Sequence, residues 1–365
     1  MLPRWHMLAA LPPWPDTSPC DSPNCDFSAF WPAGLLFRKG YSAQIYHPDL
    51  FAAIQHHLFP LEHAIVVSWI YPPPTLLLSL PISLLPYEPA FWIWTACMAL
   101  LALLILRLAG LGWAVCLATL LSPAALWNME LGQIGLLMGA CLVSGLLIRS
   151  PAGAGAVLGL LTFKPQYGLL LPLALAGGRR WVTFATLAAL MLALVALTFL
   201  VSGWPIWRAY LHTGTAVARQ FLETPPRGDS SQHFGVSIFW MIRSFGGTLS
   251  ASYGAQLVGS IAAALATWRL WRSPRVPADI RVTATVMLSL LATPYGYTDD
   301  MVAWSAVLAM SAQRRHWRIG ILDVLFWIWP MLCPVIAMDT GFELTPPVVV
   351  AGLVRCAAEL RSRKA

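Results

Sequence analysis

The sequence contains little charge and almost no lysine. Only 11% of its 365 residues are charged, whereas about 25% is usual in soluble proteins. Hydrophobic residues make up 58% of the chain, and its mean hydropathy is +0.66. A chain this apolar cannot cover a water-soluble surface with polar side chains. The composition therefore excludes an ordinary soluble domain and predicts a membrane protein.

Several signatures of ligand binding are also missing. The chain has no Cys-x-x-Cys pair and no zinc-ligand spacing, and it has no nucleotide-binding motif. No basic stretch is interleaved with aromatic residues in a soluble context, and most of the net charge of +7 sits beside apolar runs. We therefore expect no cofactor, no metal and no nucleic-acid partner, whereas membrane lipids are expected partners.

Only two of the seven cysteines lie in a polar loop, Cys20 and Cys25. They are close enough in the sequence to form a disulfide if that loop faces an oxidising compartment. The sequence leaves open whether they form one or remain free thiols. The other five lie within or at the ends of apolar runs, where cysteine usually serves as a small buried hydrophobic residue.

The charges that are present are sorted along the chain. Arginines cluster between apolar runs at 107, 149, 179–180, 269–281, 314–318 and 355–364, and most acidic residues lie in other connections. An excess of Lys and Arg marks the cytoplasmic loops of a membrane protein. The pattern predicts a multi-pass membrane protein with the acidic loops facing outward.

The first 63 residues are not expected to cross the membrane. Prolines at 12, 13 and 15 end an apolar start that is shorter than the roughly 20 residues a spanning helix needs, so a first span is expected to be missing. Residues 16–63 are interpreted as an outer interfacial loop, with short helices at 27–38 and 48–58. Aromatic residues are expected to anchor it at the level of the headgroups: Trp31, Phe37, Tyr41, Tyr46 and Phe51.

The rest of the chain alternates between apolar runs and short connections. Many runs are interrupted by Gly or Pro, and no internal repeat is visible. The longest polar break, 204–233, is interpreted as a second outer loop. We expect residues 1–365 to form a single all-α membrane domain with transmembrane, broken and re-entrant helices.

One apolar run, 152–177, has basic residues at both ends and Lys164-Pro165 in the middle. Basic flanks suggest that both ends are cytoplasmic. A broken pair of half-helices with Lys164 and Pro165 at the tip fits this pattern, because irregular backbone is tolerated at membrane depth when protein buries it. The alternative is one long tilted helix with a proline kink.

Short motifs follow one another in a characteristic order along the chain. They are Asn24-Cys25-Asp26-Phe27, Gly40-Tyr41, Ile45-Tyr46-His47-Pro48, Tyr71-Pro72-Pro73, Gly132-Gln133, Phe163-Lys164-Pro165-Gln166, and Thr293-Pro294-Tyr295 with Asp299 and Asp300. Over about residues 24–310 this order resembles glycosyltransferase family 87, membrane enzymes that use polyprenyl-phosphate sugars and include mannosyltransferases. The resemblance implies a GT-C-type membrane fold with an active site at the outer face. The chain departs from the family pattern by lacking a recognisable first span and by having Thr298-Asp299 where an aspartate and a tyrosine are expected.

Asp26 matches the aspartate that follows the first membrane span in the family, and the resemblance favours it as the catalytic base. A carboxylate in reach of an acceptor hydroxyl can take its proton as the glycosidic bond forms. The alternative is a structural role, because Asp26 opens an apolar-rich stretch and Asp is a favoured helix N-cap. Both roles are compatible.

The remaining candidates are assigned to the substrates. Lys164, one of three lysines and the only one inside an apolar run, is expected to bind the donor phosphate with help from Gln166; a snorkelling lysine or a structural ion pair is the alternative. Carboxylates accept hydrogen bonds from sugar hydroxyls, and other polar groups can assist. The residues expected to bind substrate are Asp299, Asp300, Tyr295, Gln133 and Tyr71.

These assignments predict a glycosyltransferase of the bacterial inner membrane that transfers a hexose and inverts its anomeric centre. Mannose is the favoured sugar. The donor is a polyprenyl-phosphate sugar, and the acceptor is a lipid or glycan at the periplasmic face. A secondary transporter is the rival, since transporters also use broken helices with charged residues near the breaks. A lipid-binding membrane protein without catalysis is a third possibility, and it would not need Asp26.

Overall fold

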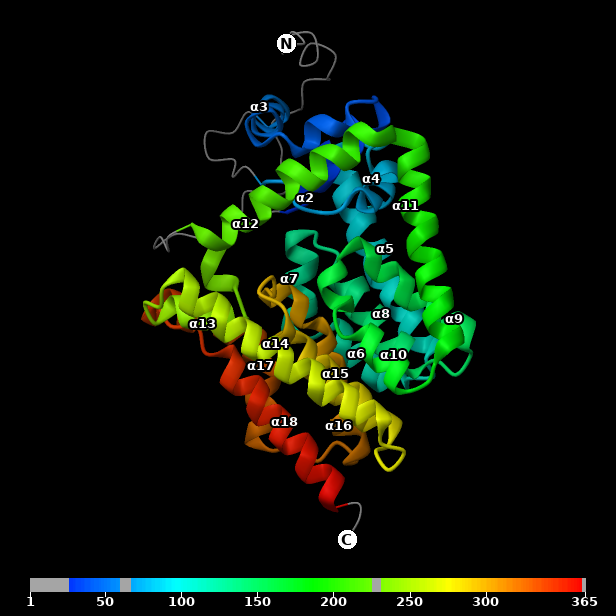
Figure 1. The fold of residues 1–365 in the computed structure, drawn as a ribbon, viewed down its shortest axis with the longest axis vertical. Helices are drawn as coiled ribbons and strands as arrows, with labels where there is room; N and C mark the ends of the chain where they lie inside the picture. The colour runs from blue at the N-terminus through cyan, green and yellow to red at the C-terminus, as the bar shows by residue number, and fades with distance from the viewer. Residues whose placement is uncertain (1–25, 60–66, 225–230, 363–365) are drawn as a thin grey trace. The chain divides into compact units, whose positions relative to one another are not determined.

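The computed structural model describes residues 26–59, 67–224 and 231–362, and in these ranges the chain is helical apart from short turns and one isolated bridge (Figure 1). Four of the described helices are long and apolar enough to cross a membrane. A helix pair bent by 52°, α6 (Trp113–Leu120) and α7 (Pro123–Leu131), raises the number to five when counted as one span. The prediction of an all-α polytopic membrane protein is confirmed. Cys20, Cys25 and the apolar start of the chain lie outside the described residues.

The chain forms two compact units, each assembled from segments that are distant in the sequence. Unit 1 comprises Met1–Cys97, Glu130–Gln133 and Leu192–Leu222, and unit 2 comprises Met98–Met129, Ile134–Met191 and Glu223–Ala365. The organisation of 1–365 as a single domain stays a prediction.

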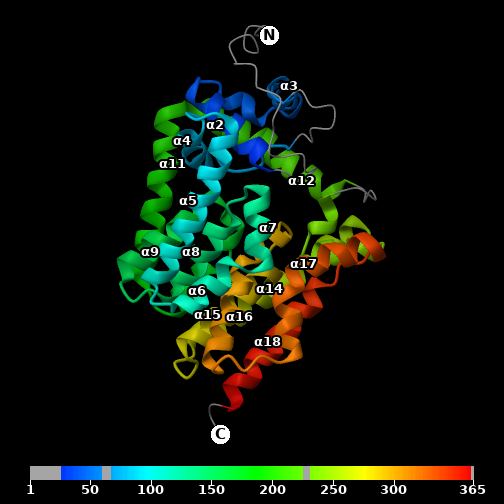
Figure 2. The same ribbon diagram turned by 180° about the vertical axis from the view of Figure 1, so that it is seen from behind.

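Unit 1 contains the two short helices that the sequence predicted, with the expected bounds. Its elements are α2 (Phe27–Arg38), η1 (Ser42–Tyr46), α3 (Pro48–Leu58), η2 (Pro73–Thr75), α4 (Leu76–Ile82), the start of α5 (Tyr87–Leu108), the end of α11 (Trp181–Ala209), η5 (Tyr210–Gly214) and most of α12 (Thr215–Glu223). Helices α2 and α4 cross closely (Figure 2). Gly34 permits this crossing, because a Cβ there would lie 2.1 Å from the backbone oxygen of Ser79.

The expected headgroup anchors are buried in the protein instead. Trp31, Phe37, Tyr46 and Phe51 have exposed fractions between 1% and 6%, and only Tyr41 is half-exposed. Helix α2 is buried around most of its circumference because α3, α4 and η1 pack against it. The prediction that these side chains face the membrane interface was therefore wrong for four of the five.

The expected outer loop at 204–233 contains much more helix than its polar composition suggests. The helix that begins at Trp181 continues through the π-helical turn η5 into α12 and ends at Glu223. Gly203, with a φ of 69°, and Pro205 bend this helix without ending it. Figure 1 shows a sharp bend within α11, after which the helix continues to α12. Which side of the membrane this segment faces stays a prediction.

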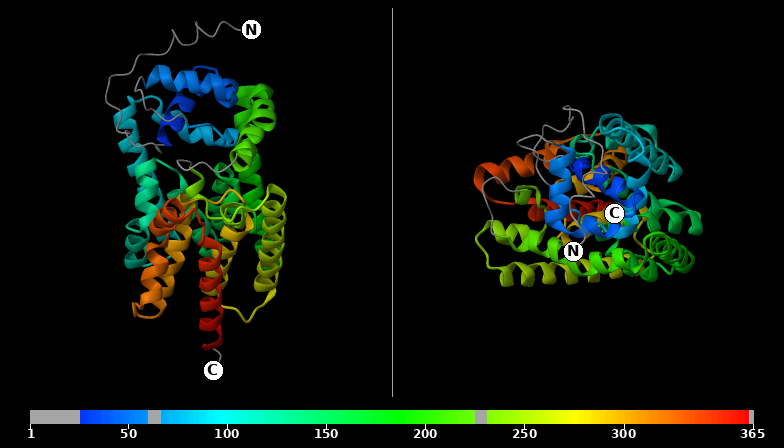
Figure 3. Two further views of the ribbon diagram at one scale, coloured as in Figure 1. Left: turned by 90° about the vertical axis from the view of Figure 1, so that its left-hand side faces the viewer. Right: turned by 90° about the horizontal axis from the view of Figure 1, so that it is seen from above.

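Unit 2 is a helical bundle whose core includes the almost completely buried helix α8 (Gly135–Leu147). Helices α9 (Pro151–Gly159), α15 (Ala278–Ala292) and α16 (Val302–Arg314) pack against α8. The other elements of unit 2 are the end of α5, α6, most of α7, η3 (Leu160–Phe163), η4 (Pro165–Gly168), α10 (Leu171–Gly177), the start of α11, η6 (Ser231–Phe234), α13 (Ile238–Ser244), α14 (Leu249–Arg272), η7 (Thr298–Met301), α17 (Ile321–Thr340) and α18 (Thr345–Ser362). The axes of the long helices α14, α17 and α18 are roughly aligned (Figure 3), and α17 and α18 are antiparallel along the chain.

The apolar run at 152–177 is broken at Lys164, as expected. Helix α9 leads into η3, Lys164 adopts a non-helical conformation with φ −142° and ψ 77°, and η4 then leads towards α10. Pro165 begins η4. Proline cannot continue an α-helix regularly, because it lacks the backbone N–H that the helical hydrogen bond requires. Two short halves therefore replace the single kinked helix of the alternative interpretation.

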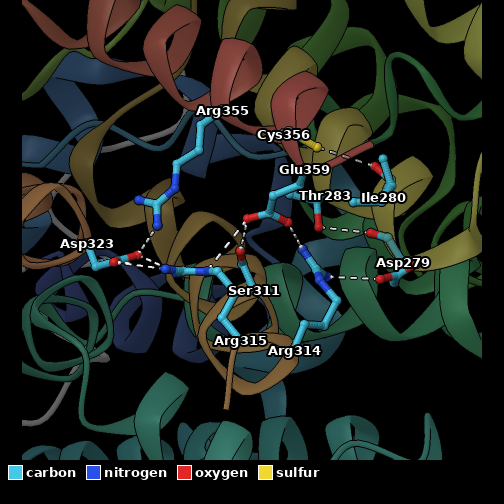
Figure 4. Close-up of polar contacts among 10 residues, drawn as sticks. All are labelled: Asp279, Ile280, Thr283, Ser311, Arg314, Arg315, Asp323, Arg355, Cys356 and Glu359. Carbon is cyan, nitrogen blue, oxygen red and sulfur yellow. Dashed lines mark hydrogen bonds and ion pairs between the residues drawn. The ribbon is translucent and has the colours of Figure 1, made fainter. Parts of the chain in front are cut away.

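The arginine clusters of unit 2 gather at one end of its helices. Arg314, at the end of α16, pairs with Asp279 at the start of α15 (3.3 Å) and with Glu359 near the end of α18 (3.1 Å). Asp323, in the first turn of α17, accepts from Arg315 and Arg355 (Figure 4). Since α15 ends at Ala292 and α16 begins at Val302, the connection that contains Asp299 and Asp300 lies at the opposite end of these two helices.

This sorting leads to a labelling prediction. In a variant without native cysteines, Ser28→Cys and Gln220→Cys should react with an impermeant maleimide added to intact cells. Tyr295→Cys, near Asp299, should react as well. Arg179→Cys and Arg318→Cys, which are exposed positions in the arginine clusters, should react only after the cells are lysed. The reverse pattern would overturn the proposed orientation.

Candidate functional site

The predicted site residues fall into two groups, one within each unit. The first group surrounds Asp26, which occupies the N-cap position of α2 but makes no side-chain capping hydrogen bond. Its Oδ2 atom instead accepts a hydrogen bond from the Nε2 atom of Gln133, at 2.6 Å. The carboxylate is half-buried, so it combines partial desolvation with a fixed polar partner. The described geometry does not give Asp26 the capping role that the sequence left open.

Gln133 joins Asp26 to a third predicted residue, Tyr71. The hydroxyl of Tyr71 donates to the Oε1 atom of Gln133 at 2.8 Å. The tyrosine ring packs against Phe30 and Trp69, with centroids 4.9 and 5.1 Å apart. Three motifs that are separate in the sequence thus meet at one place in unit 1.

Gly132 explains why Gln133 can reach Asp26. It has a φ of +66°, and a Cβ at this position would lie 2.6 Å from the Cβ of Phe27. Only glycine satisfies both the left-handed conformation and this close approach. The carbonyl of Gly132 also accepts a hydrogen bond from the indole of Trp94 at 2.8 Å. The Gly132-Gln133 motif is therefore a backbone device that brings an amide side chain to the start of α2.

The second group, in unit 2, is centred on Lys164. Its ammonium contacts Asp299 Oδ2 at 2.7 Å and Asp300 Oδ1 at 2.5 Å. All three residues are buried, with exposed fractions of 4%, 7% and 4%. One positive and two negative groups meet here, so the lysine is held as an ion pair in the structure, as one of its two sequence interpretations expected.

The backbone around the two aspartates is fixed by hydrogen bonds. Asn128 donates to the carbonyl of Asp299 at 2.6 Å and accepts from the N–H of Leu136 at 2.8 Å. The N–H of Tyr297 donates to Asp300 Oδ2 at 3.1 Å. Gly135 lets α8 approach, because a Cβ there would lie 2.4 Å from the Asp299 carbonyl. The carboxylates are thus presented to Lys164 by a rigid frame.

The charge balance of this group has an electrostatic consequence. Burial raises the pKa of the Asp300 carboxyl, and the neighbouring Lys164 ammonium opposes that rise. Without the lysine, two carboxylates in one buried site could not both remain charged at low cost. Lys164 is therefore essential to the ionisation state of this group.

The two other predicted residues lie close in the sequence to members of the Lys164 group. Gln166 is half-buried in η4, one residue after Pro165. Tyr295 is half-buried as well, and its backbone N–H donates to the Thr293 hydroxyl at 3.1 Å. Their assignment to the donor and the sugar stays a prediction.

Sequence reasoning missed the residues that hold these groups in place. Trp94 and Tyr297 contribute hydrogen bonds to the two sites, yet neither stood out among the 18 tryptophans and nine tyrosines of the chain. Trp94 bonds a residue 38 positions away, so no local pattern marks it. Tyr297 bonds Asp300, three residues further on, through its backbone N–H, which the identity of its side chain does not reveal.

Both groups place ionisable side chains at buried or half-buried positions. Ionisable side chains buried among apolar helices mark functional sites in membrane proteins, and both enzymes and ion-coupled transporters contain them. The profile of glycosyltransferase family 87 matches residues 69–294, more than half of the chain. The chain therefore belongs to glycosyltransferase family 87 and is a membrane glycosyltransferase. No curated protein and no solved structure matches it.

Only some of the candidate residues lie within the range that the family profile matches. Tyr71, Gln133 and Lys164 lie within the matched range, whereas Asp26, Asp299 and Asp300 lie outside it. Each residue outside the range is bonded to one inside it, Asp26 to Gln133 and both aspartates to Lys164. The match also decides between the enzyme and the secondary transporter in favour of the enzyme.

Proposed function

We propose that this glycosyltransferase moves a hexose from a polyprenyl-phosphate donor to a lipid or glycan acceptor, with mannose as the favoured hexose. The transfer takes place at the periplasmic face of a bacterial inner membrane and inverts the anomeric centre. Asp26 takes the proton of the acceptor hydroxyl while the oxygen of that hydroxyl bonds to the anomeric carbon. The bond from that carbon to the phosphate oxygen breaks, and polyprenyl phosphate leaves. The observation that carries the proposal is the half-buried Asp26 carboxylate, bonded to Gln133 and not engaged in capping.

The surroundings of Asp26 support the role of a base. The next residue, Phe27, is completely buried, and its ring lies 5.2–6.1 Å from those of Tyr87, Phe91 and Trp94. This packing anchors the start of α2, so the carboxylate has a fixed origin. A base contributes most when it is held within hydrogen-bond reach of the proton it removes.

Lys164 is proposed to serve the donor phosphate, with Gln166 as a second donor of hydrogen bonds. A buried ammonium stabilises the charge that develops on a leaving phosphate more strongly than one in water. The phosphate would take the place of a carboxylate on Lys164, and the displaced Asp299 or Asp300 could accept from sugar hydroxyls together with Tyr295. A phosphate already bonded to a sugar is a good leaving group, so this chemistry calls for no metal.

The direct test uses purified protein with radiolabelled polyprenyl-phosphate mannose and a lipid extract from membranes. We expect label to move into a new lipid or glycan product that is absent when the extract is omitted. Labelled GDP-mannose should not replace the lipid donor, since the sequence has no nucleotide-binding motif. Transfer from the nucleotide sugar alone, or no transfer from the lipid donor with any extract, would overturn the proposed donor. The family assignment would be unaffected by either result.

A further inference from the structure

Gln133 is bound at both ends of its side-chain amide. The exposed fraction of the residue is 9%. Its Nε2 atom lies 2.6 Å from Asp26 Oδ2, and its Oε1 atom lies 2.8 Å from the hydroxyl of Tyr71. A side chain that recognises a sugar would present its amide to the ligand, whereas this amide is engaged by protein groups on both sides.

The direction of these two bonds follows from chemistry. An ionised carboxylate can only accept, so Gln133 must turn its NH₂ group towards Asp26. Its carbonyl oxygen then faces Tyr71, and the tyrosine must donate its only O–H proton to that oxygen. A flipped amide would place its carbonyl oxygen against a negatively charged carboxylate. The Asp26 carboxylate therefore fixes which end of Gln133 it meets, and the Tyr71 hydroxyl holds the opposite end of the amide by donating to its oxygen.

Further protein groups hold both Gln133 and Tyr71 in place. The backbone of Gln133 follows Gly132, whose carbonyl is bound by Trp94. The backbone carbonyl of Tyr71 accepts from the hydroxyl of Tyr46 at 2.7 Å, and the indole of Trp69 donates to that same hydroxyl at 3.4 Å. Tyr46 is 1% exposed. These buried partners leave the Tyr71–Gln133 pair little freedom to turn towards a substrate.

We propose that Tyr71 and Gln133 are positioning residues that orient the Asp26 carboxylate, and that neither binds the sugar. The inference deepens the proposed function, since it rests on Asp26 as the base. Tyr71 acts only through Gln133, and Gln133 acts only through Asp26. This order distinguishes the pair from two independent substrate ligands.

Kinetics of the single variants test the first part of this order. Gln133→Leu should lower kcat roughly 10- to 100-fold, the size of one hydrogen bond to a charged group, with KM for donor and acceptor near the wild-type values. Tyr71→Phe should lower kcat about 2- to 10-fold, as one neutral hydrogen bond does. Gln44→Leu and Tyr253→Phe are matched controls outside the motifs that contain Asp26, Tyr71 and Gln133, and they should leave kcat unchanged. An increase in KM with unchanged kcat would show a substrate-binding role and overturn the proposal.

The double variant and a pH profile test the rest. Tyr71→Phe should cost nothing more in the Gln133→Leu background, because residues acting through one another are not additive. Gln133→Glu places a second carboxyl group within hydrogen-bond distance of Asp26, so the two groups share a proton. The acidic limb of the pH–rate profile should then move to higher pH. Additive losses of kcat, or an acidic limb that does not move, would contradict this relay, in which Tyr71 acts through Gln133 on Asp26.

A measurement without any sugar separates this inference from the proposed function. In protein labelled with ¹³C-aspartate, the infrared carboxylate band that is absent from Asp26→Asn belongs to Asp26. That band should disappear at a higher pH in Gln133→Leu than in the wild type, because the lost hydrogen bond favoured the charged form. An identical titration in both proteins would overturn the relay, even if sugar transfer is confirmed. Failure of transfer with an altered titration would instead reject the proposed donor and leave the relay standing.

Discussion

Asp26→Asn should lower sugar transfer about 10²- to 10⁴-fold, the usual contribution of a general base. The variant keeps the size of the side chain, and its amide oxygen can still accept from Gln133 Nε2. It cannot take a proton from an acceptor hydroxyl. Loss of activity with an intact fold is therefore the expected signature of base catalysis at this position.

The structure makes this substitution a clean one. Asp26 makes no capping bond in the wild type, so its replacement removes no helix cap, and Asn in any case caps about as well as Asp. Thermal stability in detergent and binding of the lipid donor should stay near the wild-type values. Asp49→Asn, an exposed acid in the first turn of α3, is the matched control and should transfer sugar normally.

Asp26→Glu provides a second measure of the same role. The added methylene moves the carboxyl group away from the position that Gln133 fixes, so this variant should retain little activity. Initial rates with radiolabelled polyprenyl-phosphate mannose report all three variants. If Asp26→Asn transfers sugar at the wild-type rate, Asp26 is not the base and the catalytic assignment fails.

The local features of the fold could be predicted because local chemistry determines them. Helices α2 and α3 have the expected bounds, since each lies between polar or turn-forming segments. The break at Lys164-Pro165 followed from a proline inside an apolar run. By contrast, Gly203 and Pro205 bend α11 without ending it, because the following residues continue as helix through η5 and α12. Proline alone does not distinguish a kink from a terminus.

The partners in the candidate site could not be predicted, because they come from distant parts of the chain. Gln133 lies 107 residues from Asp26, and Asp299 lies 135 residues from Lys164. One signal did exist for the second pair: a lysine inside an apolar run requires a counter-charge, and few acids occur near apolar runs. No comparable signal pointed from Gln133 to Asp26, since an amide needs no charged partner. The buried aromatic residues were misjudged for the same reason, as an interfacial and a packed tryptophan look alike in sequence.

Lys164→Ala should produce the second large effect. Removing one electrostatic stabiliser of the transition state costs about 10²- to 10³-fold in turnover. The affinity for polyprenyl phosphate, the reaction product, should fall roughly 10- to 100-fold, because a charge-assisted hydrogen bond is lost. Product inhibition of transfer and direct binding of labelled polyprenyl phosphate measure the two effects separately.

The ion pairs of Lys164 complicate this variant. Removing the lysine leaves Asp299 and Asp300 facing one another in a buried site, and breaking a buried pair from one side typically costs about 3–5 kcal/mol. The binding measurement must therefore be expressed per folded protein. Lys164→Arg retains the charge and should preserve the fold, although the larger planar guanidinium fits a site for a compact ammonium poorly.

Substitution of a neighbouring aspartate gives the decisive comparison. It should change the affinity for polyprenyl phosphate in the opposite direction from Lys164→Ala. In the wild type Asp299 and Asp300 neutralise Lys164 and repel an incoming phosphate. Asp299→Asn removes one of these charges while the amide can still accept from the ammonium. If Lys164 binds the donor phosphate, Asp299→Asn should bind polyprenyl phosphate more tightly than the wild type, whereas Lys164→Ala binds it more weakly. If Lys164 serves only to neutralise the aspartates, neither substitution should change phosphate binding in the folded protein, and the lysine leaves the mechanism.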